Sequence, residues 1–402
     1  MSAPLQEPPS KWSVEGLAGI PFLSYGFRPF FAFASAYAAL AMVVWVGTLM
    51  GWLSPPFAMP AVDWHIHEML FGFAAAGLAG FLLTAVASWT GREPVKGMPL
   101  VGLSVLWIAG RLAVTRGDDL SPAMVAAMDL PFLATLTVVF GREVIAASNK
   151  RNFPIIGAVA FLTVANGLTH AEAFGLNREW VGVGERLGMH VYLLLIILIG
   201  GRVIPAFTGN WLKKIGRPGE PVSIWAFELA VFGIAIIAAV ADTMMPGGPV
   251  TSGVLVLAGG LHLIRLSRWQ GLQTLSEPIV WVLHLGYLWV GVGFLLLGFS
   301  GLDYGVPRVA AVHALTAGAI GTMFLAMMTR ASLGHTGRPL AVSPATVMTY
   351  VLVTMAVVSR VVAPWWDSLW AEWMIMSAGT WIAGFGLFFA LYFPLWSKPR
   401  TT

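Results

Sequence analysis

The sequence predicts an all-α membrane protein that crosses the bilayer about twelve times. Hydrophobic residues make up 57% of the chain and charged residues only 10%, whereas soluble domains carry roughly 25% charged residues. The mean hydropathy is +0.78. A water-soluble fold could not hide this much apolar surface, but a helix bundle in lipid keeps its outer faces apolar.

Apolar stretches long enough to span a bilayer follow one another with short loops, so we predict a single transmembrane domain over residues 1–402. Residues 1–27 are expected to form a cytoplasmic tail. Residues 1–20 show no signal-peptide pattern, so the first span should itself direct insertion. The expected spans are 28–52, 65–89, 98–115, 122–145, 154–174, 186–208, 222–242, 250–269, 278–300, 307–330, 344–364 and 371–396.

Lysine and arginine concentrate in the termini and in every second loop, for example at Lys213, Lys214 and Arg217. Basic residues mark the cytoplasmic side, so both termini are expected in the cytoplasm. The same distribution argues against nucleic acid as a partner, because the positive charges are spread over all inner loops.

A weak internal repeat relates the second and tenth spans. His67 is followed by a Thr-Gly-Arg motif at 90–92, and His313 by the same motif at 336–338 with the same spacing. The sixth span carries a looser echo that begins at His190. Three spans four helices apart would suit three four-helix arcs around an axis along the membrane normal.

Histidines are the main functional candidates, because polar groups in hydrocarbon are costly and are often retained for function. Without cysteine, thiolate ligands are excluded, and imidazoles on facing helices suit haem iron or copper. Carboxylates in the spans are too few for calcium or magnesium. A structural hydrogen bond is an equally simple reading for any single histidine. The metal-ligand candidates are His65, His67, His190, His262, His284 and His313.

These histidines fall at two depths. His65, His67, His190 and His313 lie in the outer turns of their spans, with His170 ending the fifth span on the same side. A second pair, His262 and His284, is expected deeper, on adjacent spans.

The start of the second span is the most distinctive local feature. Asp63 is expected to cap the helix. His65 and His67 should point about 200° apart on a regular helix, so they cannot both face one metal unless the first turn is irregular. Glu68 lies three residues after His65 and should share its face. It could support a metal-bound histidine or relay protons, or simply cap the helix at the interface.

Two further polar groups are candidates. Tyr287 follows His284 by one turn and could donate protons or electrons, or form a structural hydrogen bond. Arg202 lies within a span and needs an anion, such as a haem propionate or a carboxylate, unless it reaches the interface. Arg111 poses the same question. Pro205 is expected to kink or end the sixth span.

Several longer motifs are shared with a known family. They lie at 25–31, 64–72, 80–86, 89–92, 201–210, 313–323 and 329–338. With these motifs the chain resembles the NnrS family of bacterial membrane proteins over nearly its full length. One departure is Ala87 and Ser88, where the family pattern has an asparagine beside Trp89.

The resemblance implies a protein of nitric oxide metabolism, in denitrification or nitrosative stress, that contains haem, expected to be b-type, with copper as a second cofactor. It carries over His65, His67, His190, His284 and His313 as ligands. The implied reaction reduces two nitric oxide molecules to nitrous oxide and water, with electrons from a quinol or a cytochrome. A fold like subunit I of the haem–copper oxidases would follow by analogy. The alternatives are a non-catalytic nitric oxide sensor or buffer, and a transporter of metal or haem.

Overall fold

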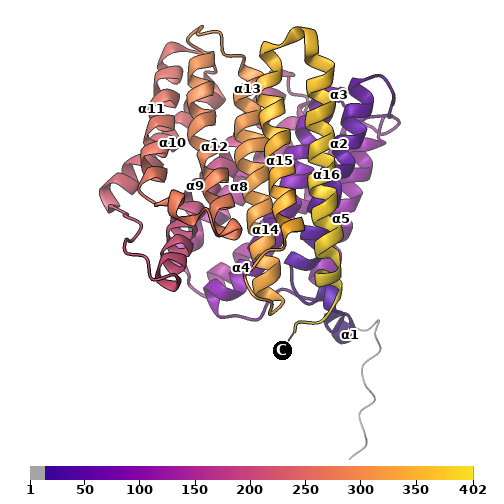
Figure 1. Cartoon of the computed structure of the whole chain (residues 1–402). Coiled ribbons are helices and arrows are strands. Elements are labelled where there is room, and N and C mark those ends of the chain that lie inside the picture. The colour runs from indigo at the N-terminus through magenta and orange to yellow at the C-terminus, as the bar shows by residue number, and fades with distance from the viewer. Residues whose placement is uncertain (1–13, 402) are drawn as a thin grey trace, which may run out of the picture.

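The structure, a computed structural model, describes residues 14–401, a region that is helical throughout and contains no β-strand. Twelve helices are long and apolar enough to cross a membrane, as the sequence predicts. Figure 1 shows them as a single bundle of upright helices, with α1 (Val14–Ala18) and the C-terminal end at the same end of the bundle. Residues 1–13, which make up about half of the expected cytoplasmic tail, lie outside the described region.

Half of the twelve spans in the described region consist of one helix, and the other half join two or three segments. The helices are α2 (Phe27–Leu49), α3 (Ala61–His67), α4 (Ala75–Thr90), α5 (Met98–Thr115), α6 (Pro122–Asp129), α7 (Pro131–Ala146), α8 (Phe153–Thr169), α9 (Glu179–Lys214), α10 (Trp225–Met244), α11 (Pro249–Ser267), α12 (Pro278–Ser300), α13 (Arg308–His313), α14 (Thr322–His335), α15 (Pro344–Val362) and α16 (Trp370–Ser397).

Helix starts follow local chemistry at several loops. The Ser343 hydroxyl accepts a hydrogen bond from the Thr346 amide at 3.2 Å, and Pro344 occupies the first position of α15. Proline fits there because that position needs no donor. Asp63 does not cap α3 as expected, because the helix begins one turn earlier with Pro60 at the cap; Asp63 instead pairs with Arg178 at 2.6 Å.

Pro205 does not end the sixth span. Helix α9 continues through it as a 36-residue helix from Glu179 to Lys214. Proline removes one backbone hydrogen bond, and in a membrane bundle packing against neighbouring helices can compensate for that loss.

The second and tenth spans share an unusual local structure at equivalent positions. Each has a π-helix that begins directly after a histidine: η2 (Glu68–Ala74) after His67, and η6 (Ala314–Gly321) after His313. The glycines of the two Thr-Gly-Arg motifs, Gly91 and Gly337, both adopt a positive φ of 68° and 78°. The internal repeat is therefore visible in the backbone of these two spans, whereas the three-arc arrangement stays a prediction. π-helices are rare and often occur at functional sites.

The first and last spans pack against each other and so close the bundle. The Trp381 indole on α16 donates to the Ala38 carbonyl at 3.0 Å, and Arg28 donates to the Trp396 carbonyl at 2.8 Å. The second span is the most enclosed of the twelve, with 83% of its apolar window buried, followed by the tenth with 67%. The two spans with π-helices therefore form the centre of the protein.

Candidate functional site

The histidines of the outer half do not form one cluster. His67 meets His170 at Asp129, His65 and His313 line a cavity, and His190 pairs with Asp242. His65 and His67 therefore belong to different sites. This agrees with their spacing, because residues two apart on a helix point in different directions.

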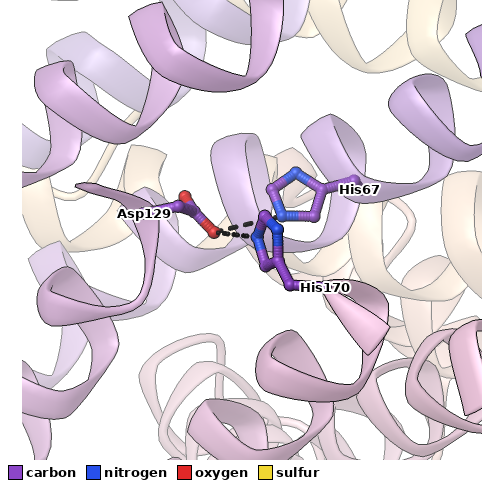
Figure 2. A group of neighbouring side chains, drawn as sticks. All are labelled: His67, Asp129 and His170. Atoms are coloured by element: carbon purple, nitrogen blue, oxygen red, sulfur yellow. Dashed lines mark hydrogen bonds and ion pairs between the residues drawn. The ribbon is translucent and has the colours of Figure 1, made fainter. Parts of the chain in front are cut away.

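The first site is a buried group of three side chains, His67, Asp129 and His170, which we call the Asp129 cluster. Figure 2 shows both imidazoles turned toward the same carboxylate. The Asp129 Oδ2 atom lies 3.2 Å from His67 Nε2 and 3.1 Å from His170 Nε2. His67 ends α3, Asp129 ends α6 just before Pro131 begins α7, and His170 follows α8. All three lie at helix ends.

A second shell of polar groups surrounds the Asp129 cluster. The Asn166 amide donates to Asp129 Oδ2 at 2.7 Å, and His67 Nδ1 lies 2.9 Å from Glu68 Oε1. Arg111 donates to both carboxylates, Glu68 and Asp129. The Tyr37 hydroxyl also donates to Glu68. Two carboxylates therefore face one arginine, so one further positive charge, either a proton on the imidazole or a metal ion, would neutralise the site.

Glu68 does not pair with His65 as expected. The α-helix ends at His67 and the wider π-helix begins at Glu68, so the regular three-residue spacing no longer decides which side chains share a face. The Glu68 carboxylate is fully buried and contacts His67, Arg111 and Tyr37. The buried charge of Arg111 is thus balanced by two carboxylates, and its side chain does not extend to the membrane interface.

The spacing of the Asp129 cluster suits a metal ion. A tetrahedral ion bound at about 2.0–2.1 Å holds its ligand atoms about 3.3 Å apart. Asp129 Oδ2 lies 3.1 Å and 3.2 Å from the two imidazole nitrogens, and all three candidate ligand atoms lie within 4.8 Å of one another, so the group could hold a metal ion. Two imidazoles and a carboxylate form a donor set that zinc, copper and iron accept. The sequence analysis named His67 but missed Asp129, although a carboxylate inside a span is itself a signal of function.

The second site is a cavity of about 470 Å³ around the starts of the second and tenth spans, which we call the outer cavity. Its walls come from α2, α3, α9, α13, α15, α16 and both π-helices. Cofactor pockets commonly measure about 300–1,000 Å³. Two histidines face it, His65 from the second span and His313 from the tenth. It therefore joins the two spans that carry the internal repeat.

Both imidazoles of the outer cavity are oriented by neighbours. His65 stacks on Trp45 with ring centroids 4.4 Å apart, and its buried Nδ1 has no hydrogen-bond partner among residues 14–401. His313 Nδ1 donates to the Val309 carbonyl at 2.8 Å, which leaves Nε2 as the nitrogen with a free lone pair. Histidine ligands of metals are commonly oriented by such a bond on the second nitrogen.

Charge also gathers at the outer cavity. Arg186, Arg308 and Arg360 line it together with one carboxylate, Glu185. Arg308 pairs with Asp242 at 2.9 Å, whereas Arg360 forms no ion pair within residues 14–401. Arg360 lies close enough to His65 and His313 to interact with both electrostatically. With three arginines against Glu185 and Asp242, the site has one surplus positive charge.

Arg202 does not take part in either site. Its side chain is exposed on α9, and no ion pair joins it to any described residue. The sequence shows that an arginine lies in this span, but the side of the helix that it occupies depends on packing. The arginines that line the outer cavity are Arg186 on α9, Arg308 on α13 and Arg360 on α15.

His190 is held outside the outer cavity. Its Nε2 lies 3.0 Å from Asp242 Oδ2, and the same carboxylate accepts from Arg308. His190 is almost completely buried, with 1% of its surface exposed. It therefore supports the charged wall of the outer cavity through Asp242 without lining it.

The expected inner pair of His262 and His284 is not formed. His262 Nδ1 lies 2.8 Å from the Tyr287 hydroxyl, and His284 Nε2 lies 2.8 Å from the Thr208 hydroxyl. Within the described region no hydrogen bond or ring contact joins the two histidines. Trp269 contacts both groups, with centroids 4.6 Å from Tyr287 and 6.5 Å from His284, and so lies on the way between them.

Tyr287 also differs from the expected arrangement. Its hydroxyl lies beside His262 rather than His284, and it accepts a hydrogen bond from Arg265 at 2.7 Å. Arg265 in turn pairs with Glu228. Tyr287 is thus fully engaged in a buried polar group of its own and lines neither the outer cavity nor the Asp129 cluster.

The fold and these sites define a multi-pass membrane protein with a buried histidine–carboxylate cluster and a cavity of cofactor size. The family model described as NnrS protein matches residues 21–400. The chain belongs to the NnrS family, and this membership supports a role in nitric oxide metabolism. The comparison with curated proteins finds no match.

Proposed function

We propose that this protein binds nitric oxide at a haem held in the outer cavity and acts in nitric oxide metabolism in the bacterial inner membrane. One observation carries the proposal: a cavity of about 470 Å³ presents the imidazoles of two spans together with Arg360, which has no acidic partner among residues 14–401. A lone cation inside a membrane protein is costly. It is therefore a natural partner for the carboxylates of a ligand.

The residues present fit this group. His65 and His313 would hold the iron, and Arg360 and Arg308 would hold the propionates. A chain without cysteine cannot attach haem covalently through thioethers, which excludes c-type haem, and we propose the b-type. The surplus positive charge of the cavity matches the net negative charge of an iron(III) haem with two carboxylates. Because two imidazoles would leave the iron no open position, nitric oxide would bind there in place of one of them, and the haem would supply the electron transfer to it.

We assign copper to the Asp129 cluster. His67 and His170 would supply imidazole nitrogens and Asp129 a carboxylate oxygen, a donor set that suits copper. Glu68 and Asn166 would orient these ligands, as outer-shell carboxylates and amides commonly do. His190, His262 and His284 are less suited as ligands, since none of them meets a second histidine at a shared carboxylate, as His67 and His170 do at Asp129.

As an enzyme, the protein would combine two nitric oxide molecules, two electrons and two protons to give nitrous oxide and water. A quinol or a cytochrome would supply the electrons. Glu68 would serve as the proton carrier, because it connects His67, Arg111 and Tyr37 in one buried network. Tyr287 would carry protons or electrons only from a distance, since His262 and Arg265 occupy its hydroxyl.

The test is an optical spectrum and a metal analysis of the purified protein, compared with His65→Ala and His313→Ala. We expect a haem Soret band and iron in the parent protein and a strong loss of both in each variant. His335→Ala is the matched control, because His335 packs against Tyr25 and Phe27 away from both sites. A protein that is expressed and folded but contains neither iron nor copper would overturn the proposal.

Turnover separates the enzyme from the alternatives. Steady production of nitrous oxide from nitric oxide with a reduced quinol would support the reductase, whereas tight binding without turnover would indicate a sensor or a buffer. Transport of haem or metal would instead require a cofactor that leaves the protein. Fusion of reporter domains to the two termini would test the expected cytoplasmic location of both.

A further inference from the structure

A second, smaller cavity lies farther along the same central helices. It has a volume of about 60 Å³, opens on one side, and is bounded by α4, α9 and α14 with one contribution from α2. We call it the inner cavity. The α9 residues that line it include Ile196, Ile199, Gly200 and Val203, whose spacing places them on one face of the helix.

The walls of the inner cavity are apolar. Tyr192 brings a hydroxyl group to the wall, but this hydroxyl already donates a hydrogen bond to the Leu70 carbonyl at 2.8 Å. Three methionines of α14, Met323, Met327 and Met328, supply soft and polarizable surface. A buried water needs two to four polar partners, and cavities lined by apolar side chains stay dry.

The size of the inner cavity limits what can enter. A cavity needs about 10–15 Å³ to hold one molecule the size of water. A volume of about 60 Å³ therefore admits a diatomic gas or a noble-gas atom but no haem and no quinol ring. Such small apolar molecules can reach it directly from the hydrocarbon core of the membrane.

Aromatic rings separate the inner cavity from the outer cavity. Phe324 and Tyr192 line the inner cavity, and Phe73 lines the outer one. The Phe324 ring centroid lies 5.9 Å from that of Phe73 and 6.1 Å from that of Tyr192. Gly77 lies beneath this ring, since a Cβ atom there would come within 2.8 Å of Phe324 Cδ1. Phe324 is therefore the side chain of the inner cavity that lies next to a side chain of the outer cavity.

We propose that the inner cavity is a binding site for a small apolar gas and that it leads past Phe324 to the outer cavity. That nitric oxide is the natural occupant rests on the proposed function. That the inner cavity binds a small apolar gas does not rest on it, because this follows from the size and the apolar lining of the cavity alone.

The binding test uses xenon, which reports occupancy of apolar cavities without chemistry. Crystals of the full-length protein under xenon pressure should show an anomalous peak in the inner cavity. Ile199→Trp should fill the cavity and abolish the peak. Ile237→Trp is the matched control, since Ile237 lies on α10 with 53% of its surface exposed. Absence of xenon from the parent protein, or a lipid chain or ordered water in its place, would overturn the proposal.

A milder variant guards against misfolding. In Gly200→Ala the added Cβ atom would lie 3.5 Å from Ile204 and 3.6 Å from Tyr287, which is ordinary contact distance. This variant should fold and show reduced xenon occupancy. Full occupancy in both Gly200→Ala and Ile199→Trp would place the xenon elsewhere and contradict the proposal.

The route is tested by the association rate of nitric oxide, followed by its optical signal. Ile199→Trp should slow association by about tenfold, the low end of the range over which such rates vary among variants, while Ile237→Trp should not. A parent protein that binds xenon but never nitric oxide would refute the proposed function and leave the gas site standing. An unchanged association rate in a variant that has lost xenon would refute the route.

Discussion

Asp129 is the side chain on which the buried cluster depends most. Its two oxygens accept from His67, His170, Asn166 and Arg111. Asp129→Asn keeps the shape but removes the negative charge and places an amide donor against four existing donors. Arg111 then retains Glu68 as its one acidic partner.

The expected cost can be bounded from two sides. Neutral hydrogen bonds between membrane helices average about 0.6 kcal/mol, whereas breaking a buried ion pair from one side costs about 3–5 kcal/mol. Because Asp129 is 2% exposed and pairs with a buried arginine, we expect the upper range. That corresponds to a fall of roughly 150- to 4,000-fold in the folding equilibrium constant.

The assay is reversible unfolding in mixed micelles, with Asp367→Asn as the control because Asp367 is exposed and unpaired among residues 14–401. The double variant Arg111→Gln with Asp129→Asn should lose less stability than the sum of the single losses, since the two partners are removed together. A loss of about 0.6 kcal/mol or less in Asp129→Asn, or strict additivity in the double variant, would refute this reasoning.

Two further predictions concern packing and the outer cavity. Gly26→Ala should lower stability by about 1–3 kcal/mol, because the added Cβ atom would overlap Leu83, while Gly102→Ala, with nothing within 4 Å of the added atom, should be neutral or better in an unfolding assay. Arg360→Leu should lower the haem content or shift the Soret band. Arg202→Leu should do neither, because of these two arginines only Arg360 lines the outer cavity. Equal spectra for the two variants would contradict the role assigned to Arg360.

The spans could be predicted from the sequence because membrane insertion depends on local apolar runs. The ninth span, expected at 278–300, is helix Pro278–Ser300, and the third, expected at 98–115, is Met98–Thr115. The different surroundings of His65 and His67 also follow from local geometry, since helical periodicity separates residues two apart. Features that depend on one helix alone were therefore predictable.

Contacts between spans could not be predicted in the same way. Asp129 meets His67 across 62 positions of the chain and His170 across 41, and no local pattern encodes such a meeting. The π-helices after His67 and His313 were also missed. Only their shared place in the internal repeat hinted that the two positions are alike. The prediction that Tyr287 lies beside His284 was wrong for a related reason. A tyrosine one turn after a histidine can equally turn toward a neighbouring helix, and Tyr287 turns toward His262.

The most direct test of a haem held by His65 and His313 is the electron paramagnetic resonance spectrum of the oxidised protein. We predict a low-spin iron(III) signal typical of two imidazole ligands. His65→Ala and His313→Ala should each convert or abolish this signal, while His335→Ala should retain it. A haem signal that is the same in the parent protein and in both variants would contradict the assignment of the outer cavity as the haem site.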